Sequence, residues 1–383
     1  MKFLSSLNNN DLENKICLLR VDFNVSGDLF SNPRLVKILP TIKFLLAKKA
    51  KIIILSHLGR PKHGERAASK NLSLKFAAEF LESKLKKKIN FINHFDFYKI
   101  SEGIKSCPAC GIFLLENLRL IDGEEGNDEK LARKLASLGD FYVNDAFSVS
   151  HRKNASVAAI TKFLPSYAGL LMESEIKSLS EAINNPKKPL IVILGGAKIS
   201  DKLGLIKNFL LTGRRRADYF LVGGGIANTF LAAQNLPIGD SLYEKDMLLL
   251  AKKFLKSGKI ILPSDVIIDE RKILDIGPKT IEKYSDLIKK AKMIIWNGPV
   301  GYFEDEQFAK GSKAIAKVIL SSKAQAIIGG GETTSLFQVS GIKYQDKKHI
   351  FLSTGGGAML EFLGGKKLPG IAALEYNKMI IKT

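Results

Sequence analysis

The sequence predicts an α/β fold of two doubly wound, parallel-sheet (Rossmann-like) domains that are joined by a hinge helix. Two observations support this prediction. Short continuous runs of aliphatic residues alternate with amphipathic stretches along all 383 residues, and this is the pattern of parallel strands covered by helices on both faces. The chain is also longer than a single hydrophobic core usually serves, so two domains of ordinary size are expected.

The first half contains four such apolar runs. They are KICLLRV (15–21), KIIILSHL (51–58), GIFLLEN (111–117) and DFYVNDAF (140–147). The helical pattern EKLARKLASLG lies between the last two and ends in Gly139, a typical signal for a helix C-terminus. We expect residues 1–170 to form the N-terminal domain.

The second half repeats this alternation. Its apolar runs are PLIVILGG (189–196), DYFLVGGG (218–225), KIILPSD (259–265), KMIIWNGP (292–299), QAIIGGG (325–331) and KHIFLSTGGG (348–357). The helical stretch MESEIKSLSEAINN precedes the first of them and is bounded by prolines, as a hinge between domains would be. We expect residues 171–367 to form the C-terminal domain.

Charge and cysteine content restrict the class of protein. The net charge of +21 is spread over both halves without a basic tail, which indicates an attraction for small anions more than for nucleic acid. The uncharged segment 219–239 contains glycine, asparagine and proline, so a buried element is expected there and no membrane span. Three cysteines and the lack of an export signal favour the cytoplasm. The CPAC sequence at Cys107 and Cys110 has no second ligand pair, so a metal is not expected there.

Cationic and polar side chains follow the predicted strands of the first half. Ligands bind at the carboxyl ends of parallel strands, and only 11 of the 59 basic residues are arginines, the side chain suited to bidentate binding of phosphate and carboxylate. The pattern predicts a pocket for a small, multiply anionic molecule. Its candidate residues are Arg20, Asp22, Asn24, Arg34, His57, Arg60, Asn117, Arg119, Asn144, Asp145, His151 and Arg152.

Glycine-rich turns follow the strands of the second half. They are GGAKISDK (195–202), GGGIANTF (223–230), NGPVGYF (297–303), GGGETTS (329–335) and STGGGAM (353–359). Bare backbone N–H groups at helix starts bind phosphate, and Lys198 and Lys202 extend from one side of the first turn. Because neither GxxxxGK[ST] nor GxGxxG occurs, the turns predict a nucleotide site of another kind. An anion pocket and a phosphate site in separate domains together suggest phosphoryl transfer.

The motifs RVDFNV, SHLGRP, ENLR, VNDAF with SHR, LGGAKISDK, GGGIANTF, WNGPVG and STGGGA stand in this order along the chain. In these motifs the sequence resembles the phosphoglycerate kinase family over essentially its whole length. The resemblance implies reversible phosphoryl transfer between MgATP and 3-phosphoglycerate, giving MgADP and 1,3-bisphosphoglycerate, in glycolysis and gluconeogenesis. It further implies a cytoplasmic monomer that works by hinge bending, and a C-terminal segment, 368–383, that packs back onto the N-terminal domain.

The resemblance also assigns roles to residues of this chain. It implies that Arg34 and Lys198 stabilise the transferring group, with Gly330 and Gly356 at the catalytic site. The residues expected to bind phosphoglycerate are Asp22, Asn24, Arg34, His57, Arg60, Arg119 and Arg152. Those expected to bind nucleotide are Lys198, Lys202, Gly223, Gly224, Asn297, Glu304, Gly329, Gly330, Gly331, Glu332 and Thr333. Glu304 is assigned to the ribose and Glu332 to the magnesium ion of MgATP. No general base is needed, because the acceptor carboxylate is already ionised.

Three positions depart from the family's usual pattern. Ser26 replaces a proline, and Asn154 replaces a second histidine, so Asn154 is left out of the predicted site. Glu332 replaces an aspartate; it can still bind a hard cation through oxygen, but its extra methylene displaces the charge. Two other classes remain as alternatives, an NAD-type oxidoreductase and a basic nucleic-acid-binding protein.

Overall fold

The computed structural model describes residues 1–25, 32–61, 72–107, 111–211, 213, 216–339 and 346–380. Ser26 and Cys110, which were singled out above, lie outside these residues. The chain divides into two compact units, one formed by Met1–Ile176 with Lys367–Thr383 (unit 1) and one formed by Lys177–Lys366 (unit 2). The chain passes from unit 1 to unit 2 within helix α7 (Leu170–Asn184).

Unit 1 is built on a six-stranded sheet in the order β3-β4-β2-β1-β5-β6. Every strand pair in it is parallel, as continuous apolar strands require. The strands are β1 (Ile16–Arg20), β2 (Lys51–Leu55), β3 (Ile89–Ile92), β4 (Ile112–Leu115), β5 (Phe141–Asn144) and β6 (Ser166–Ala168). The sequence patterns indicate four of these strands, whereas β3 is interrupted by Asn90 and β6 is only three residues long.

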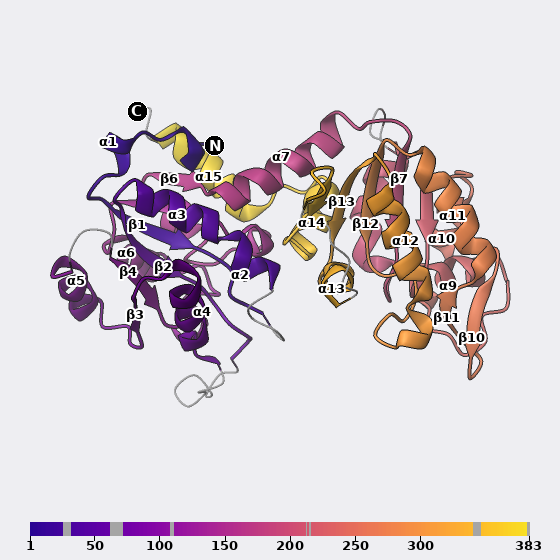
Figure 1. Cartoon of the computed structure of the whole chain (residues 1–383), viewed down its shortest axis with the longest axis horizontal. Coiled ribbons are helices and arrows are strands. Elements are labelled where there is room, and N and C mark those ends of the chain that lie inside the picture. The colour runs from indigo at the N-terminus through magenta and orange to yellow at the C-terminus, as the bar shows by residue number, and fades with distance from the viewer. Residues whose placement is uncertain are drawn as a thin grey trace. The chain divides into compact units, whose positions relative to one another are not determined.

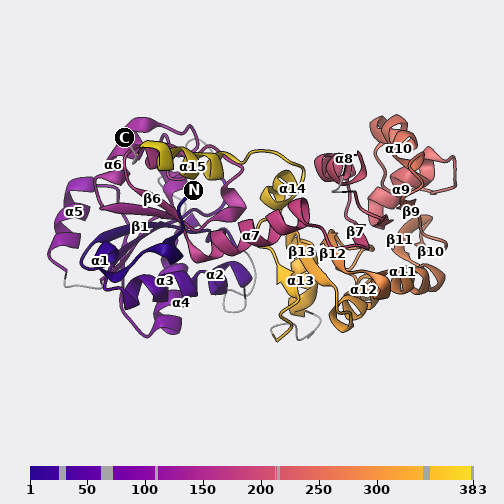
Figure 2. The same cartoon turned by 90° about the horizontal axis from the view of Figure 1, so that it is seen from above.

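Helices flank this sheet, as Figures 1 and 2 show. They are α1 (Asn9–Leu12), α2 (Pro33–Lys37), α3 (Leu39–Ala47), α4 (Lys75–Leu85), α5 (Phe97–Lys105) and α6 (Glu129–Ala136), with 3-10 turns η1 (Leu4–Ser6), η3 (Leu118–Leu120), η4 (Phe147–Val149) and η5 (Ala159–Lys162). Leu19 and Ile54 of the sheet share one buried cluster with Ile42 of α3 and Leu81 of α4. Asp96 and Asp128 accept hydrogen bonds from the first turns of α5 and α6, which fixes where these helices begin.

The last helix, α15 (Pro369–Ile380), returns to unit 1 and lies beside β6 and η5 (Figure 1). The buried side chain of Asn377 connects it to the loop before β6. Asn377 accepts a hydrogen bond from the backbone N–H of Ser166 at 2.9 Å and donates to the carbonyl oxygens of Thr161 and Leu164 at 2.6 and 3.0 Å. The carbonyl oxygen of the Asn377 amide and both of its N–H groups therefore have partners away from water, which makes this contact specific.

Unit 2 contains a second six-stranded parallel sheet, in the order β14-β13-β12-β7-β8-β9. Its strands are β7 (Leu190–Leu194), β8 (Tyr219–Val222), β9 (Ile260–Ile261), β12 (Met293–Asn297), β13 (Gln325–Gly329) and β14 (Ile350–Leu352). An antiparallel hairpin of β10 (Val266–Asp269) and β11 (Lys272–Ile276) is added to it. The sequence patterns indicate all six sheet strands but not the hairpin.

The helices of unit 2 are α8 (Leu203–Leu211), α9 (Gly224–Ala233), α10 (Leu248–Leu255), α11 (Pro278–Lys290), α12 (Lys310–Ser321), α13 (Gly331–Val339) and α14 (Gly357–Leu363), with 3-10 turns η6 (Ser200–Lys202), η8 (Lys245–Met247) and η9 (Glu306–Phe308). Ile193 and Trp296 of the sheet form one core cluster with Tyr284 of α11, Ile319 of α12 and Phe337 of α13. Two parallel sheets with flanking helices confirm the predicted fold class. No described helix combines the length and apolar character needed to cross a membrane.

Candidate active site

The carboxyl ends of β1 and β2 bring Asp22, Arg34 and His57 of unit 1 together. Arg34 Nη1 lies 3.3 Å from Asp22 Oδ2, and His57 Nε2 lies 3.8 Å from Asp22 Oδ1. Arg34 also donates to the carbonyl oxygen of Asn24 at 2.8 Å, while Asn24 Oδ1 accepts from the backbone N–H of Gly59 at 2.9 Å. These contacts join three sequence segments at one edge of the sheet.

The charge state of Asp22 is set by these neighbours. Burial alone would raise the pKa of this carboxyl, but His57, Arg34, a hydrogen bond from the Ser148 hydroxyl and one from the Asn24 backbone hold the pKa below its usual value. Asp22 is therefore an ionised hydrogen-bond acceptor at neutral pH. Sequence reasoning missed Ser148, because nothing in FSVS distinguishes its hydroxyl from that of a turn residue.

Arg119 lies in a group of arginines. Only 2% of Arg119 is exposed, and it donates to the carbonyl oxygen of Gly59. Burial, with Arg152, Arg20 and Arg60 nearby, lowers the pKa of Arg119 to about 10, although Glu125, 3.4 Å from Arg119 Nε, opposes this shift. Positive charges that lie close together in a buried site disfavour one another's protonated form. A bound anion between these arginines would offset their mutual repulsion.

The remaining sequence-predicted residues of unit 1 frame this group. Arg60 is exposed, while Arg152 is partly buried and donates from Nε to His151 Nε2 at 3.3 Å. Asn117 is fully buried and bonds to both backbone groups of Leu58, at 3.0 and 2.8 Å, so it supports the loop after β2. Asn154, which was left out of the predicted site, is buried. Its backbone carbonyl oxygen accepts hydrogen bonds from the backbone N–H groups of Val157 and Ala158.

In unit 2, the ends of β7, β12 and β13 bring Lys202, Asn297 and Thr333 together. Lys202 Nζ donates to Asn297 Oδ1, and Thr333 Oγ1 accepts from the backbone N–H of Gly298 at 2.7 Å. Burial lowers the pKa of Lys202, although Asp201 and Glu332 act in the opposite direction. Asn297 is 1% exposed, and its buried Nδ2 has no hydrogen-bond partner among the described residues. A buried amide donor without a partner suits an acceptor oxygen of a ligand.

The predicted glycines fall into three kinds. Gly223 and Gly329 are buried in tightly packed places. A Cβ on Gly223 would lie 2.5 Å from the Cβ of Val300, and a Cβ on Gly329 would lie 2.0 Å from the Sδ of Met359. Gly330 and Gly356 have positive φ angles of +99° and +49° just before α13 and α14, where glycine is favoured. Gly331 has open space around its Cβ position.

A pocket of about 340 Å³ opens beside these turns. This volume is in the range of small-molecule sites. It contains three sequence-predicted residues, Gly224, Glu304 and Glu332. The other residues that line it are Gly196, Ala197, Gly225, Asn228, Ser241, Leu242, Lys272, Ile273, Leu274, Pro299, Gly301 and Tyr302. The quoted motifs include the glycines, Pro299 and Tyr302, whereas Lys272, Ile273 and Leu274 come from the unforeseen hairpin strand β11.

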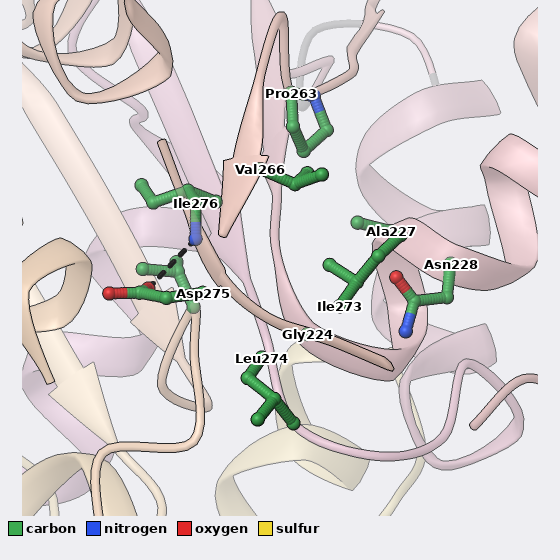
Figure 3. A pocket seen from close by; sticks show the side chains of 10 residues that line it. Gly224, Ala227, Asn228, Pro263, Val266, Ile273, Leu274, Asp275 and Ile276 are labelled. Carbon is green, nitrogen blue, oxygen red and sulfur yellow. Dashed lines mark hydrogen bonds between the residues drawn. The ribbon is translucent and has the colours of Figure 1, made fainter. Parts of the chain in front are cut away.

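A second cavity of about 10 Å³ adjoins this pocket and shares Gly224, Asn228, Ile273 and Leu274 with it. Figure 3 shows Asn228 beside Ala227 and Ile273, with Pro263 and Val266 beyond them. Asn228 Nδ2 donates to the Leu242 carbonyl at 3.1 Å, whereas its buried Oδ1 has no partner among the described residues. Asn228 therefore offers an acceptor atom to this end of the pocket, which the sequence did not reveal.

Lys198 is exposed at the turn after β7, and Glu304 and Glu332 are exposed as well. Among the described residues, no group of three or more histidine, cysteine, aspartate or glutamate side chains is placed to hold a metal ion. A single carboxylate such as Glu332 suits magnesium that arrives with a nucleotide, because this ion keeps waters and phosphate oxygens as most of its ligands.

Comparison with known proteins gives one family. The sequence profile described as "Phosphoglycerate kinase" matches residues 7–366. The phosphoglycerate kinase of Pseudothermotoga lettingae is 43% identical over 397 aligned positions, which cover 96% of this chain and 98% of that protein. The phosphoglycerate kinase of Herpetosiphon aurantiacus is 42% identical, with coverage of 94% and 96%.

Solved structures agree with this. The phosphoglycerate kinase from Coxiella burnetii matches with a TM-score of 0.81 at 37% identity, covering 97% of this chain and 98% of that one. The enzyme from Pyrococcus horikoshii matches with a TM-score of 0.85 at 32% identity, covering 99% and 100%. Neither comparison supports an NAD-type oxidoreductase or a nucleic-acid-binding protein. The chain, matched over nearly its whole length, belongs to the phosphoglycerate kinase family.

Proposed function

We propose that this chain transfers a phosphoryl group reversibly between MgATP and the carboxylate of 3-phosphoglycerate, and that the residues described above carry out the reaction. The observation that carries the proposal is the arginine group of unit 1. Arg119 is buried among Arg20, Arg60 and Arg152, and its pKa is lowered for that reason. A small ligand with phosphate and carboxylate groups neutralises such a group better than a neutral substrate does.

On the substrate side, we assign the phosphate of phosphoglycerate to His57, Arg60, Arg119 and Arg152. Asp22, an ionised acceptor, suits the substrate hydroxyl group, and the amide of Asn24 with the guanidinium of Arg34 suits the carboxylate. Arg34 is about one-third exposed, at 30% of its side-chain surface, so it can reach a ligand while it stays paired with Asp22. These assignments require no proton transfer by the protein.

On the nucleotide side, we assign the base and ribose to the pocket of about 340 Å³ and its residues Gly224 and Glu304. The phosphates are assigned to the turns Gly223–Gly224 and Gly329–Gly331, with Lys202, Asn297 and Thr333. Support comes from the unpartnered amide Nδ2 of Asn297 and from the positive φ of Gly330, which leaves the backbone at the start of α13 uncovered. Glu332 would hold the magnesium ion, which supplies charge neutralisation to the nucleotide phosphates.

The moving phosphoryl group is assigned to Lys198 from unit 2 and Arg34 from unit 1, with the backbone at Gly330 and Gly356 close to it. Phosphoryl transfer needs charge neutralisation, in-line positioning and exclusion of water. We propose that bending at α7, the hinge helix, allows the two bound substrates to meet. We further propose that the enzyme acts as a monomer in the cytoplasm and that its positive surface serves anionic metabolites and not nucleic acid.

The test is a coupled assay with ATP, magnesium and 3-phosphoglycerate on the unaltered protein, on Lys198→Ala and on Lys207→Ala. Lys207 is an exposed lysine of α8 and serves as the matched control. We expect Lys198→Ala to lower kcat by roughly 100-fold or more, since its charge is used most in the transition state, and to change both KM values far less. Equal rates for the two variants would remove Lys198 from the catalytic site. Absence of turnover that depends on both substrates in the unaltered protein would overturn the proposed function.

A further inference from the structure

Arg20, at the end of β1, has no role in the proposed binding of substrate, yet it is the most deeply placed arginine of the group. Only 1% of it is exposed. It donates from Nε to Ser156 Oγ at 2.8 Å and from Nη1 to the carbonyl oxygen of Val21, and its Nη2 lies 3.2 Å from Nδ1 of His57. The guanidinium therefore uses all three of its nitrogens inside the protein.

Glu124 and Ser156 hold Arg20 in this position. Glu124 is 0% exposed, and its Oε1 lies 4.0 Å from Arg20 Nη2. It accepts from the Ser156 hydroxyl at 2.6 Å and from the Ser156 backbone at 3.0 Å, while Tyr142 donates to the Ser156 carbonyl at 2.7 Å. A buried ion pair of this kind is weak evidence for stability, because its desolvation cost offsets the attraction. Stability alone therefore does not account for the buried pair of Arg20 and Glu124.

The contact with Arg20 has a chemical consequence for His57. A guanidinium only donates hydrogen bonds, so Nδ1 of His57 must accept and carries no proton. The proton of a neutral ring is then on Nε2, the atom 3.8 Å from Asp22 Oδ1. The tautomer of a histidine is set by the hydrogen bond that its other nitrogen makes.

Burial and the arginines around His57 act on its protonation in the same sense. Burial lowers the pKa of His57 well below its usual value, and Arg20, Arg119 and Arg152 lower it further, whereas Asp22 opposes them. A second proton on Nδ1 would also point at the Arg20 guanidinium. Burial and these arginines therefore favour the neutral form of the ring.

We infer that Arg20 is a positioning residue: anchored by Glu124 and Ser156, it fixes His57 as the neutral Nε2–H tautomer, so that the ring presents a hydrogen-bond donor to an oxygen of the bound phosphoglycerate. This inference rests on the proposed function, which supplies the ligand. Arg20 would then act on the substrate through the side chain of His57 and not by direct contact.

The test combines histidine nitrogen NMR with substrate kinetics. The chain has only five histidines, so a sample labelled with ¹⁵N at histidine gives a simple spectrum, and His57→Gln assigns the signal of interest. In the unaltered protein we expect an Nε2–H pattern for His57 that does not titrate from pH 8 to about pH 6, below the ordinary histidine pKa of about 6.5. An Nδ1–H pattern, or titration near the ordinary value, would overturn the inference without any variant.

Two variants then separate positioning from packing. Arg20→Met/Glu124→Gln removes both buried charges, and Glu124→Gln alone keeps Arg20 beside His57. We expect the double variant to lose the fixed Nε2–H pattern at His57, because no donor then faces Nδ1, and to raise the KM for 3-phosphoglycerate about tenfold, as the loss of one ligand hydrogen bond would. The kcat and the KM for MgATP should stay within about twofold. Glu124→Gln should keep the Nε2–H pattern.

The outcomes of the two measurements are distinguishable. If the double variant keeps the Nε2–H pattern unchanged, or keeps the KM of the unaltered protein, Arg20 has no positioning role. If the unaltered protein shows the expected NMR pattern but no turnover with phosphoglycerate, the proposed function fails, and the inference about the substrate fails with it, while the assignment of the tautomer stands.

Discussion

Glu332 lies in the first turn of α13, is exposed, and lines the pocket of about 340 Å³ in unit 2. Its carboxylate is close enough to raise the pKa of Lys202, against the lowering effect of burial. The same charge would attract a magnesium ion brought in by a nucleotide. At the scale of single residues, the proposed role of Glu332 in holding this ion can therefore be tested directly.

We predict that Glu332→Asp preserves activity or tightens the use of magnesium, and that Glu332→Ala raises the magnesium concentration for half-maximal rate by about tenfold, the effect of one lost charged contact. The measurement is the rate as a function of magnesium at fixed ATP. Glu306→Ala, which changes a carboxylate that is 84% exposed on η9, is the control. If neither change at Glu332 alters the magnesium dependence, the residue does not hold the ion.

At the scale of elements, the turns of unit 2 bring backbone segments very close together. A Cβ on Gly225, in the first turn of α9, would lie 2.3 Å from the carbonyl oxygen of Ala197, in the turn after β7. Gly331, at the start of α13, has nothing within 4 Å of its Cβ position. Two glycines from similar motifs therefore have different physical reasons for being glycine.

We predict that Gly225→Ala destabilises unit 2 by about 1–3 kcal/mol, because the backbones of two turns must separate. Gly331→Ala should leave the stability unchanged or slightly higher, since alanine favours a helix by about 1 kcal/mol over glycine. Urea unfolding of both variants measures the difference. Equal losses of stability would mean that the close approach of the two turns does not constrain Gly225.

At the scale of the whole molecule, each unit contains a buried carboxyl group with a raised pKa. Burial raises the pKa of Asp145 in unit 1 and of Asp275 in unit 2 to about 6. Asp145 Oδ1 accepts from the N–H of Met172, in the first turn of α7, at 3.0 Å. Asp275 accepts from the N–H of Gly311, in α12, at 2.7 Å. Both carboxyl groups accept a hydrogen bond from the first turn of a helix. Because their pKa values are raised, both hold a proton more readily in the folded protein than in the unfolded chain.

The sign of the pH effect follows from this. Between about pH 6 and pH 4 the folded state binds more protons at Asp145 than the unfolded chain does, so this group adds stability as the pH falls. The difference between a pKa of about 6 and the ordinary aspartate value of about 3.9 corresponds to at most about 3 kcal/mol in the free energy of unfolding. His57 acts in the opposite sense, because its lowered pKa removes stability as the pH falls below about 6.5.

We predict that Asp145→Asn loses free energy of unfolding relative to the unaltered protein as the pH falls from 7 to 4, since asparagine keeps the acceptor oxygen but cannot take up the proton. Urea unfolding at several pH values measures this. Glu102→Gln, at an exposed carboxyl of α5 that is 54% accessible, is the control and should show a constant difference. A constant difference for Asp145→Asn as well would place its pKa at the ordinary value.

Sequence reasoning predicted the fold well because buried parallel strands are continuous apolar runs, and such runs as LIVIL in β7 are fully buried here. It missed β3, β6 and the hairpin β10–β11. Residue Asn90 interrupts β3, β6 is three residues long, and strand β10 of the hairpin is largely exposed. Such strands gain stability from pairing with neighbours, which a local pattern does not contain.

The sequence by itself determined the α/β class, the strand ends that bear arginine in one half and glycine in the other, and the family resemblance. These depend on local periodicity and on residue types at known points of the chain. Only the tertiary structure decided that Arg20 faces His57 while Glu124 and Ser156 hold it, and that residues of β11 and Asn228 line the pocket of about 340 Å³. Those contacts join residues as many as 136 positions apart, as for Arg20 and Ser156, and the packing of the whole unit fixes them.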